Sequence, residues 1–190
     1  MAKEVDARGL ACPQPVILTK HALGKEKDLV ILVDNPTSRD NVKRFAESQG
    51  CLVTVEQAGS DYKICITSSQ EKADVPSVKI GTVFYITADS IGRGSEELGK
   101  ILIPGFFEAL TQEDRKPDKI IFTNSGVNLV CTGSPVLESL KVLAGKGGEV
   151  LACGTCLDYY NLKEKVQVGR VTNAYEILSS LMAAENVITV

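Results

Sequence analysis

Near its start the chain reads Arg8-Gly9-Leu10-Ala11-Cys12-Pro13-Gln14-Pro15, a short turn that brings a cysteine to the start of a predicted helix. Proline suits the first position of a helix, because its missing N–H would be unpaired there and its φ is already helical. We therefore predict a helix over Pro13–Leu23, with Cys12 at its N-cap. Unpaired backbone N–H groups and the helix dipole at that position favour the thiolate, the nucleophilic form of cysteine.

Other residues of the same stretch are predicted to support this thiol, namely Arg8, Gly9, Pro13 and Pro15. Arg8 adds positive charge if the turn folds it back toward the sulfur. The alternative is that Cys12 is only a small buried capping residue. The two flanking prolines favour the reactive interpretation.

Outward from this turn, the sequence predicts a small sandwich of one sheet and two helices. The expected strands are Lys3–Asp6, Asp28–Val33, Cys51–Glu56 and Tyr62–Thr67, which all have buried or alternating apolar patterns. A capping box at Thr37-Ser38-Arg39-Asp40 opens the second helix, and Gly50 ends it. The order βαβαββ predicts a two-layer α/β sandwich, in which two helices cover a four-stranded sheet.

The pattern Arg-Gly-Leu-x-Cys-Pro-x-Pro, placed shortly after a strand that ends at Asp6, resembles the signature of the TusA/SirA-type sulfur-carrier family. The resemblance covers residues 1–69. It implies a two-layer α/β domain whose Cys-Pro cysteine, here Cys12, carries a persulfide between partner proteins.

The other thiols and the histidine of this half are expected to be structural. His21 lies about 13 Å along the predicted helix from Cys12, at about 1.5 Å per residue. A general base must come within about 3 Å of its thiol, so we predict that His21 is an ordinary surface residue. Cys51 and Cys65 fall in strands and are predicted to pack as small hydrophobic side chains.

Charge and composition exclude several classes of protein. The net charge of −3 over 190 residues argues against a general nucleic-acid surface. No apolar run reaches the roughly 18 residues of a membrane span, and the N-terminus lacks a secretory h-region. Six cysteines without a signal peptide indicate reactive, metal-binding or core thiols rather than disulfides, and we expect a soluble cytoplasmic protein.

Residues 70–78 are polar and contain Pro76, and they predict a linker between residues 1–69 and a second domain over residues 79–190. Strands are expected at Ile80–Thr87, Lys119–Thr123, Glu149–Cys153, Val166–Val168 and Val187–Thr189. The first helix of this half is expected at Ser95–Leu110, with a kink at Pro104. The second runs from Ser134, with Pro135 in its first helical position, to Ala144, and a short third helix begins at Thr155. The last is expected at Asn173–Ala184, with its inward face formed by Ile177, Leu178, Leu181 and Met182. This alternation predicts a mostly parallel α/β layered domain of flavodoxin or Rossmann type.

Polar and reactive side chains follow three of these strands. They are Asp89 and Ser90, Asn124 and Ser125, and Cys153. Ligands of parallel sheets bind outside the carboxyl ends of the strands, so these side chains are predicted to collect at one edge. The turn Gly92-Arg93-Gly94 is not a dinucleotide fingerprint, because Glu97 takes the place of the third glycine. Arg93 either binds an anion at a helix start or belongs to a plain glycine turn.

Cys153-Gly154-Thr155-Cys156 is the second chemical motif. A zinc half-site is disfavoured, because no second pair of ligands completes four-coordination. The pair can instead cycle as a dithiol and a disulfide, or one thiol can receive sulfur or selenium while its neighbour resolves it. Purely structural cysteines remain an alternative. Cys131 is either a third participant or, as we favour, a packing residue.

The second half resembles the DsrE-like family of sulfur-relay proteins, in which the acceptor cysteine ends a strand just before a short helix. Cys153 matches that position, and the additional Cys156 departs from the simplest pattern. The whole chain, with its Ser-Gly-Val, Gly-Ser-Pro-Val-Leu-Glu and Cys-Gly-Thr-Cys-Leu-Asp segments, resembles the YedF-type proteins, sulfurtransferase-like proteins of selenium metabolism. The resemblance also implies self-association through the second domain.

The leading hypothesis is a sulfur or selenium carrier that relays its cargo from Cys12 to Cys153, Cys156 or a partner protein. The expected partners are a donor, which is a cysteine desulfurase or a selenocysteine lyase, and an acceptor protein. No cofactor, metal, nucleic acid or membrane is expected. The alternatives are a dithiol redox module that uses Cys153 and Cys156, and a non-catalytic adaptor.

Overall fold

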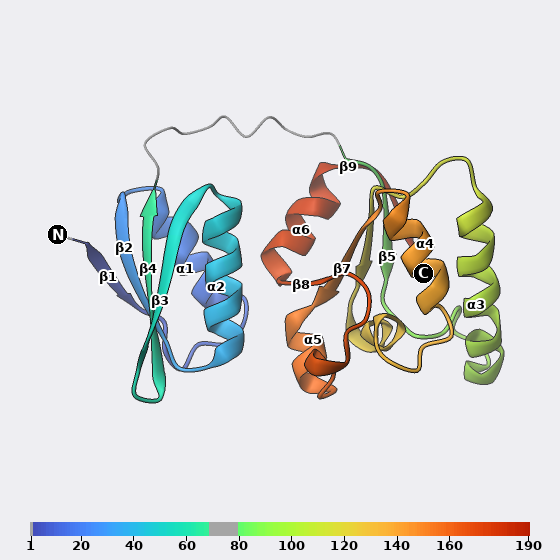
Figure 1. The fold of residues 1–190 in the computed structure, drawn as a ribbon, viewed down its shortest axis with the longest axis horizontal. Helices are drawn as coiled ribbons and strands as arrows, with labels where there is room; N and C mark the ends of the chain where they lie inside the picture. Colours follow the sequence, from blue (N-terminus) through green and yellow to red (C-terminus); the bar gives the residue numbers. More distant parts are fainter. Residues whose placement is uncertain (1, 69–79) are drawn as a thin grey trace. The chain divides into compact units, whose positions relative to one another are not determined.

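A computed structural model describes residues 2–68 and 80–190 (Figure 1). The chain forms two units, one around the sheet β1–β4 and one around the sheet β5–β9. The predicted linker, residues 70–78, lies outside the described residues, so its boundaries stay a prediction. None of the helices described is long and apolar enough to cross a membrane.

The first unit has the predicted order βαβαββ. Its elements are β1 (Lys3–Asp6), α1 (Gln14–Leu23), β2 (Asp28–Val33), α2 (Pro36–Ser48), β3 (Cys51–Ala58) and β4 (Asp61–Ser68). The sheet order is β1-β2-β4-β3, with β1 parallel to β2 and the other pairs antiparallel. The α/β sandwich predicted for this half is therefore confirmed.

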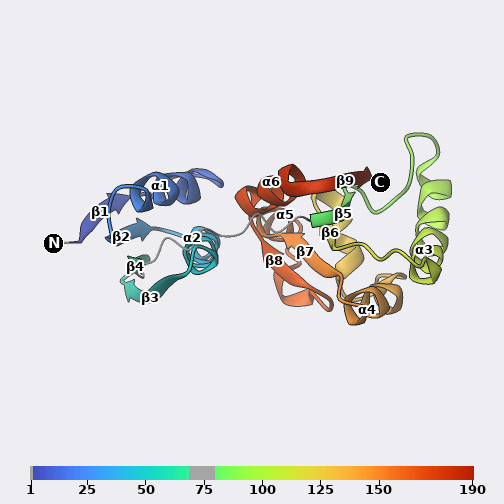
Figure 2. The ribbon, with the colours of Figure 1, turned by 90° about the horizontal axis from the view of Figure 1, so that it is seen from above.

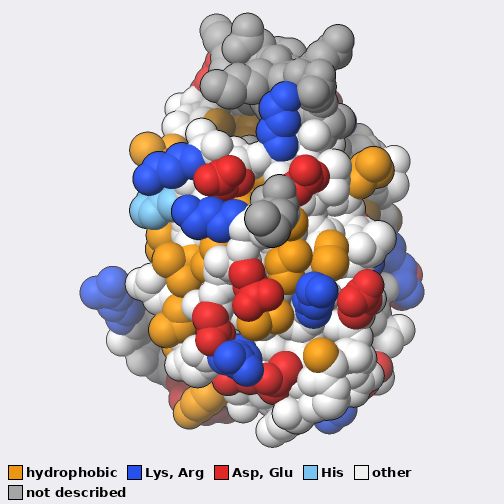
Figure 3. Space-filling model, turned by 90° about the vertical axis from the view of Figure 1, so that its left-hand side faces the viewer, with side chains coloured by type: hydrophobic (Ala, Val, Ile, Leu, Met, Phe, Trp, Pro, Cys, Tyr) orange, Lys and Arg blue, Asp and Glu red, His pale blue; other side chains and the backbone are white. Residues whose placement is uncertain are grey.

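Alternation along the strands builds the core of the first unit. In β2, Leu29, Ile31 and Val33 are buried, while the residues between them are only partly buried. Val42 and Phe45 of α2 are buried in the same cluster. Both helices lie on one face of the sheet (Figure 2). On the face of this unit that Figure 3 shows, hydrophobic side chains lie among acidic and basic ones.

Both helices of the first unit begin at a different residue from the predicted one. The N–H of Gln14 donates to the carbonyl of Ala11 at 2.9 Å, which closes a turn with a cis Cys12–Pro13 peptide at its centre. Pro13 is consequently the N-cap of α1, and Cys12 precedes the cap instead of occupying it. In α2 the cap is Asn35, whose side-chain oxygen accepts from the Ser38 N–H at 2.8 Å, ahead of the predicted capping box.

The second unit is built on a five-stranded parallel sheet with the order β8-β7-β6-β5-β9. Its strands are β5 (Ile80–Ile86), β6 (Lys119–Phe122), β7 (Glu149–Cys153), β8 (Arg170–Thr172) and β9 (Ala184–Thr189). Its helices are α3 (Glu96–Gln112), α4 (Leu137–Gly145), α5 (Gly154–Tyr159) and α6 (Ala174–Ala183), with 3-10 turns at Asn124–Val130 and Lys163–Lys165. The predicted parallel α/β layering is confirmed.

Several details of the second unit differ from the expectation. Val166 forms only an isolated bridge with Cys131, and the strand predicted around it lies at β8, after Gly169. The helix expected from Ser134 begins at Leu137, because Ser134 uses its hydroxyl to accept from the Val136 N–H before the helix starts.

Two helices of the second unit also differ from the prediction in packing or length. In α6, Leu178 is 56% exposed and Met182 is 80% exposed. Ile177 is buried as predicted, and Leu181 packs against the core. The other buried position is Ser180, which accepts a hydrogen bond from Lys119 at 3.1 Å. The helix α3 continues through Pro104 to Gln112, beyond its predicted end.

Ligands of parallel α/β sheets bind outside the carboxyl ends of the strands, so this end of the second sheet is the candidate site. Figure 2 shows α3 and α4 on one face of the sheet and α6 on the other. The strands β6 and β7 are neighbours in the sheet, and the chain segments that follow them meet in a bridge between Cys131 and Val166. Asn124 follows β6 and Cys153 ends β7, so both lie at the carboxyl ends of these strands.

Candidate functional site

Cys12 is half-buried in the turn that leads into α1, and a buried amide from α2 faces it. The side-chain nitrogen of Asn41 donates to the Cys12 sulfur at 3.9 Å, and Asn41 is only 2% exposed. Sequence reasoning missed Asn41. The signal was its position directly beside Val42 on the inward face of α2, where a polar residue needs a partner.

The turn before Cys12 is held by carboxylates of the sheet edge. Gly9 has φ +71, a conformation that favours glycine, and its N–H donates to Asp34 at 2.6 Å. Arg8 pairs with Asp6 at 2.7 Å and with Asp61 at 3.2 Å. The hydrogen bond from the Arg8 side chain lowers the pKa of Asp6 to about 2, and the Gly9 N–H lowers the pKa of Asp34.

The sequence suggested that Arg8 could add positive charge near Cys12. In the structure its charge is instead taken up by ion pairs. Its guanidinium is neutralised by two carboxylates, and its contribution is to hold the shape of the turn. Of the two prolines, Pro15 is buried in the first turn of α1, and its carbonyl accepts from the buried Thr19 hydroxyl at 2.8 Å. Pro13 caps the helix.

The histidine and the other two cysteines of the first unit lie on the helix and the strands predicted for them. His21 is exposed on α1. Cys51 and Cys65 lie half-buried in β3 and β4, and burial raises the pKa of Cys51.

In the second unit the structure brings Cys153, Cys156 and Asn124 together at the carboxyl ends of β6 and β7. Cys153 is the N-cap of α5 and is 8% exposed, whereas Cys156 is half-buried. The backbone N–H of Asn124 donates to the Cys156 sulfur at 3.1 Å, and Asn124 itself has φ +49. The Tyr160 hydroxyl donates to the Asn124 side-chain oxygen at 3.1 Å. The Ser125 hydroxyl accepts from the Asp89 N–H at 3.3 Å.

A shallow pocket of about 280 Å³ exposes this motif on one side. It is lined by Asn124, Thr155, Cys156, Tyr159 and Tyr160. Cys153 is not among the lining residues. Asp158 is the charged residue of α5, and its carboxylate pairs with Lys163 at 2.6 Å. Cys156 is therefore the thiol that an incoming group meets.

Burial affects the ionisation of Cys153. Burial raises the pKa of Cys153 to about 12, and the side-chain hydrogen bond with Cys156 acts in the same direction. The backbone groups of Cys156 and Thr155 act against this shift without cancelling it. The Cys153 thiol thus stays protonated at neutral pH, which differs from the expectation that it could serve directly as a thiolate acceptor.

We expect iodoacetamide at pH 7.5 to label Cys156 at least about tenfold faster than Cys153, because only the thiolate is nucleophilic and only Cys156 lines the pocket. Peptide mass mapping over time measures both rates in one sample. Labelling of Cys153 should rise steeply only as the pH approaches about 12. Equal rates at pH 7.5 would contradict this assignment.

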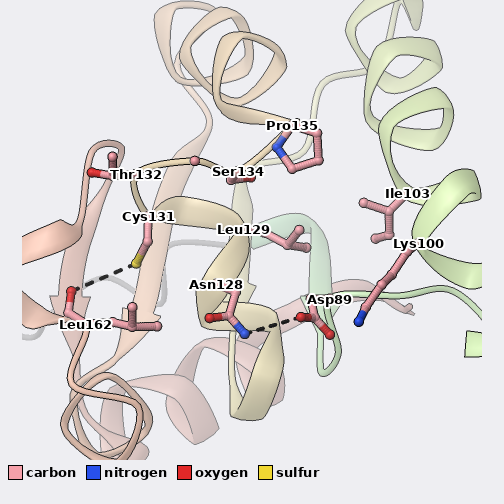
Figure 4. A pocket seen from close by; sticks show the side chains of 11 residues that line it. Asp89, Lys100, Ile103, Asn128, Leu129, Cys131, Thr132, Ser134, Pro135 and Leu162 are labelled. Atoms are coloured by element: carbon pink, nitrogen blue, oxygen red, sulfur yellow. Dashed lines mark hydrogen bonds between the residues drawn. The ribbon is translucent and has the colours of Figure 1, made fainter. Parts of the chain in front are cut away.

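Two further cavities lie near this end of the sheet. One, of about 640 Å³, is lined in part by Arg93 and the ends of β5 and β9, and it shares Asn124 with the Cys156 pocket. The other, of about 320 Å³, has Asp89 and Lys100 on one side and Cys131 on the other (Figure 4). Cys131 is buried, donates to the Val127 carbonyl at 3.2 Å, and has a pKa raised by burial. It therefore packs, as the sequence favoured.

Among the residues that the structure describes, no group of three His, Cys, Asp or Glu side chains is placed to hold a metal ion.

Comparison with known proteins identifies a family for the first unit. The family model Sulfurtransferase TusA matches residues 3–68, which include Cys12. A Methanocaldococcus jannaschii protein named "Putative sulfur carrier protein" is 37% identical over 68 residues, which are 34% of this chain and 91% of that protein. The crystal structure of a SirA-like protein from Desulfitobacterium hafniense covers 35% of this chain and 97% of its own, at 33% identity and TM-score 0.32. The ychN protein from E. coli covers 57% of this chain and 99% of its own, at 18% identity and TM-score 0.45.

Proposed function

We propose that this chain, which belongs to the TusA sulfurtransferase family through residues 3–68, carries sulfane sulfur as a persulfide on Cys12. The observation that carries the proposal is the placement of Cys12. It lies inside the matched segment, half-buried in a carboxylate-anchored turn, and the buried amide of Asn41 is directed at its sulfur.

Loading is a transfer of neutral sulfur between two thiolates. The Cys12 thiolate attacks the outer sulfur of a donor persulfide, so that Cys12–S⁻ and R–S–SH give Cys12–S–SH and R–S⁻. The donor is a cysteine desulfurase for sulfur. A selenocysteine lyase supplies selenium in the same way and leaves Cys12–S–Se⁻.

Asn41 is proposed to hold the outer atom of the cargo. The distance of 3.9 Å from its nitrogen to the Cys12 sulfur is long for a hydrogen bond. A second sulfur, bonded to the first at about 2.05 Å, can approach the amide more closely and accept from it. A hydrogen bond to a charged acceptor contributes about 1.5–3 kcal/mol, so the amide favours the persulfide anion over the free thiol.

We expect Asn41→Leu to shorten the lifetime of the Cys12 persulfide about tenfold or more, in line with the loss of one charge-assisted hydrogen bond. The persulfide is followed by its transfer to an external thiol after the donor is removed. Asn41→Asp, which keeps the shape but places an acceptor and a negative charge there, should be worse than Asn41→Leu. A merely structural role would instead make both variants less stable with no change in persulfide lifetime per folded molecule.

The cargo is proposed to leave Cys12 by a second thiolate exchange, onto the Cys153–Cys156 motif or onto the thiol of an acceptor protein. The finer assignments rest on the sequence patterns of the second half. From these patterns we propose that the second unit is DsrE-like and self-associates, and that the whole chain is of the YedF type. Its proposed role is in selenium metabolism or sulfur relay in the cytoplasm. Thiol chemistry of this kind requires the reducing conditions found there.

The deciding experiment is incubation with a cysteine desulfurase and cysteine, followed by intact and peptide mass spectrometry. We expect the gain of one sulfur atom on the peptide that contains Cys12. Repeating the experiment with a selenocysteine lyase and selenocysteine compares selenium with sulfur as cargo. A Cys153–Cys156 disulfide with no added sulfur on Cys12 would favour the dithiol redox module, and no change in either unit would favour the adaptor.

A further inference from the structure

We infer that Cys156 and Cys153 form a release centre, in which a persulfide on Cys156 is reduced by the Cys153 thiol and the cargo leaves as hydrosulfide. This activity goes beyond the proposed carriage of sulfur. A carrier passes sulfur on without a change in oxidation state, whereas this step reduces it. The inference does not require that Cys12 be the source of the persulfide.

The first argument is access. Cys156 lines the pocket of about 280 Å³ and is half-buried, so a persulfide-bearing molecule can reach its sulfur. The Asn124 N–H already points at that sulfur at 3.1 Å. Tyr160 keeps Asn124 in place through its hydroxyl, at 3.1 Å from the side-chain oxygen. Cys156 is thus both reachable and held by a fixed donor.

The second argument is the position of Cys153. It is 8% exposed and does not line the pocket, so an external persulfide does not reach it first. Cys153 is the N-cap of α5 and Cys156 lies three residues further along, so the first turn of the helix brings the two side chains to the same side. A thiol that is covered from solvent but lies beside the acceptor is suited to attack what the acceptor receives.

The third argument is the proton balance. Cys153 is a buried protonated thiol, and a persulfide on Cys156 is an anion beside it. The proton of Cys153 passes to the outer sulfur, and the Cys153 sulfur attacks the Cys156 sulfur. Nucleophilicity rises with thiol pKa, so the deprotonated Cys153 is a strong nucleophile.

The complete step is Cys156–S–S⁻ and HS–Cys153 giving Cys156–S–S–Cys153 and HS⁻. One sulfur–sulfur bond forms, one breaks, and the released sulfur gains the two electrons that the thiol pair loses. A dithiol reductant then restores the pair by exchange. With a selenium cargo, the same step releases hydroselenide.

The test uses the full chain with Cys12→Ser, so that the proposed carrier thiol is absent. The probe is glutathione persulfide, added anaerobically without another reductant. Hydrosulfide is quantified against a protein-free blank, and peptide mass spectrometry reports the state of Cys153 and Cys156. We expect one equivalent of hydrosulfide per chain and a Cys153–Cys156 disulfide.

Three further variants are built on the Cys12→Ser background. Adding Cys153→Ser should leave a stable persulfide on Cys156 and reduce hydrosulfide release at least tenfold. Adding Cys156→Ser should abolish both the formation of a persulfide on this motif and the release of hydrosulfide. Adding Cys65→Ser, a half-buried thiol of the first unit, is the matched control and should change neither.

The inference is overturned if release persists after Cys153→Ser, if Cys153 accepts the persulfide when Cys156 is absent, or if a persulfide accumulates on Cys156 while Cys153 is intact. Carriage on Cys12 is measured separately, on the chain that retains Cys12. A negative result for hydrosulfide release at Cys156 and Cys153 therefore leaves the proposed carriage on Cys12 unaffected, and the reverse also holds.

Discussion

Replacing Cys12 with serine is expected to abolish desulfurase-dependent loading of the first unit, a loss of at least about a hundredfold. A serine hydroxyl cannot form a sulfur–sulfur bond, so no alternative covalent adduct replaces the persulfide. The substitution keeps the shape of a half-buried side chain in a turn anchored by the Gly9–Asp34 hydrogen bond. The fold of the unit should therefore be retained.

The matched controls are Cys51→Ser and Cys65→Ser, which change thiols of the same unit that lie in strands. Both should load at the native level on Cys12. Circular dichroism and thermal unfolding of all three variants separate lost chemistry from lost structure. Continued loading of the first unit in the Cys12→Ser variant would refute the assignment of the carrier thiol.

Replacing Gly169 with alanine is expected to destabilise the second unit by about 2–5 kcal/mol. Gly169 has φ +83, and a Cβ there would lie 2.5 Å from the carbonyl oxygen of Val150 and 2.7 Å from its Cβ. The residue immediately precedes β8, and Val150 lies in the neighbouring strand β7. The backbone strain and the steric clash therefore act together at a sheet position that cannot easily move.

Gly133→Ala separates the two causes. Gly133 has φ +90, but nothing lies within 4 Å of the Cβ that alanine would add. Its cost should be limited to the conformational strain, about 1–2 kcal/mol. Urea unfolding followed by circular dichroism measures both free energies of unfolding. Equal losses for the two variants would show that the clash with Val150 relaxes without cost.

The errors made from sequence share a physical cause. The helix starts at Pro13, Thr37 and Ser134 were misplaced by one to three residues, because competing caps and turns several residues apart all match the local pattern. Only the hydrogen bonds formed in the folded chain, such as Ser38 N–H to Asn35, select between them. In α6, Ile177 and Leu181 were placed correctly, but Leu178 and Met182 are exposed. The buried Ser180 was missed because its partner, Lys119, lies in another element.

Local pattern was enough to identify Cys12 as the reactive thiol candidate, to order the first unit as βαβαββ and to predict a parallel sheet in the second. These properties depend on residues close together in the chain, where apolar periodicity, proline and glycine act directly. Packing between distant segments decided the rest. It directed Asn41 at Cys12, bound Arg8 to Asp61, and made Cys156 accessible and Cys153 covered. Such contacts join residues many positions apart, so they arise only when helices and strands bring them within a few ångströms.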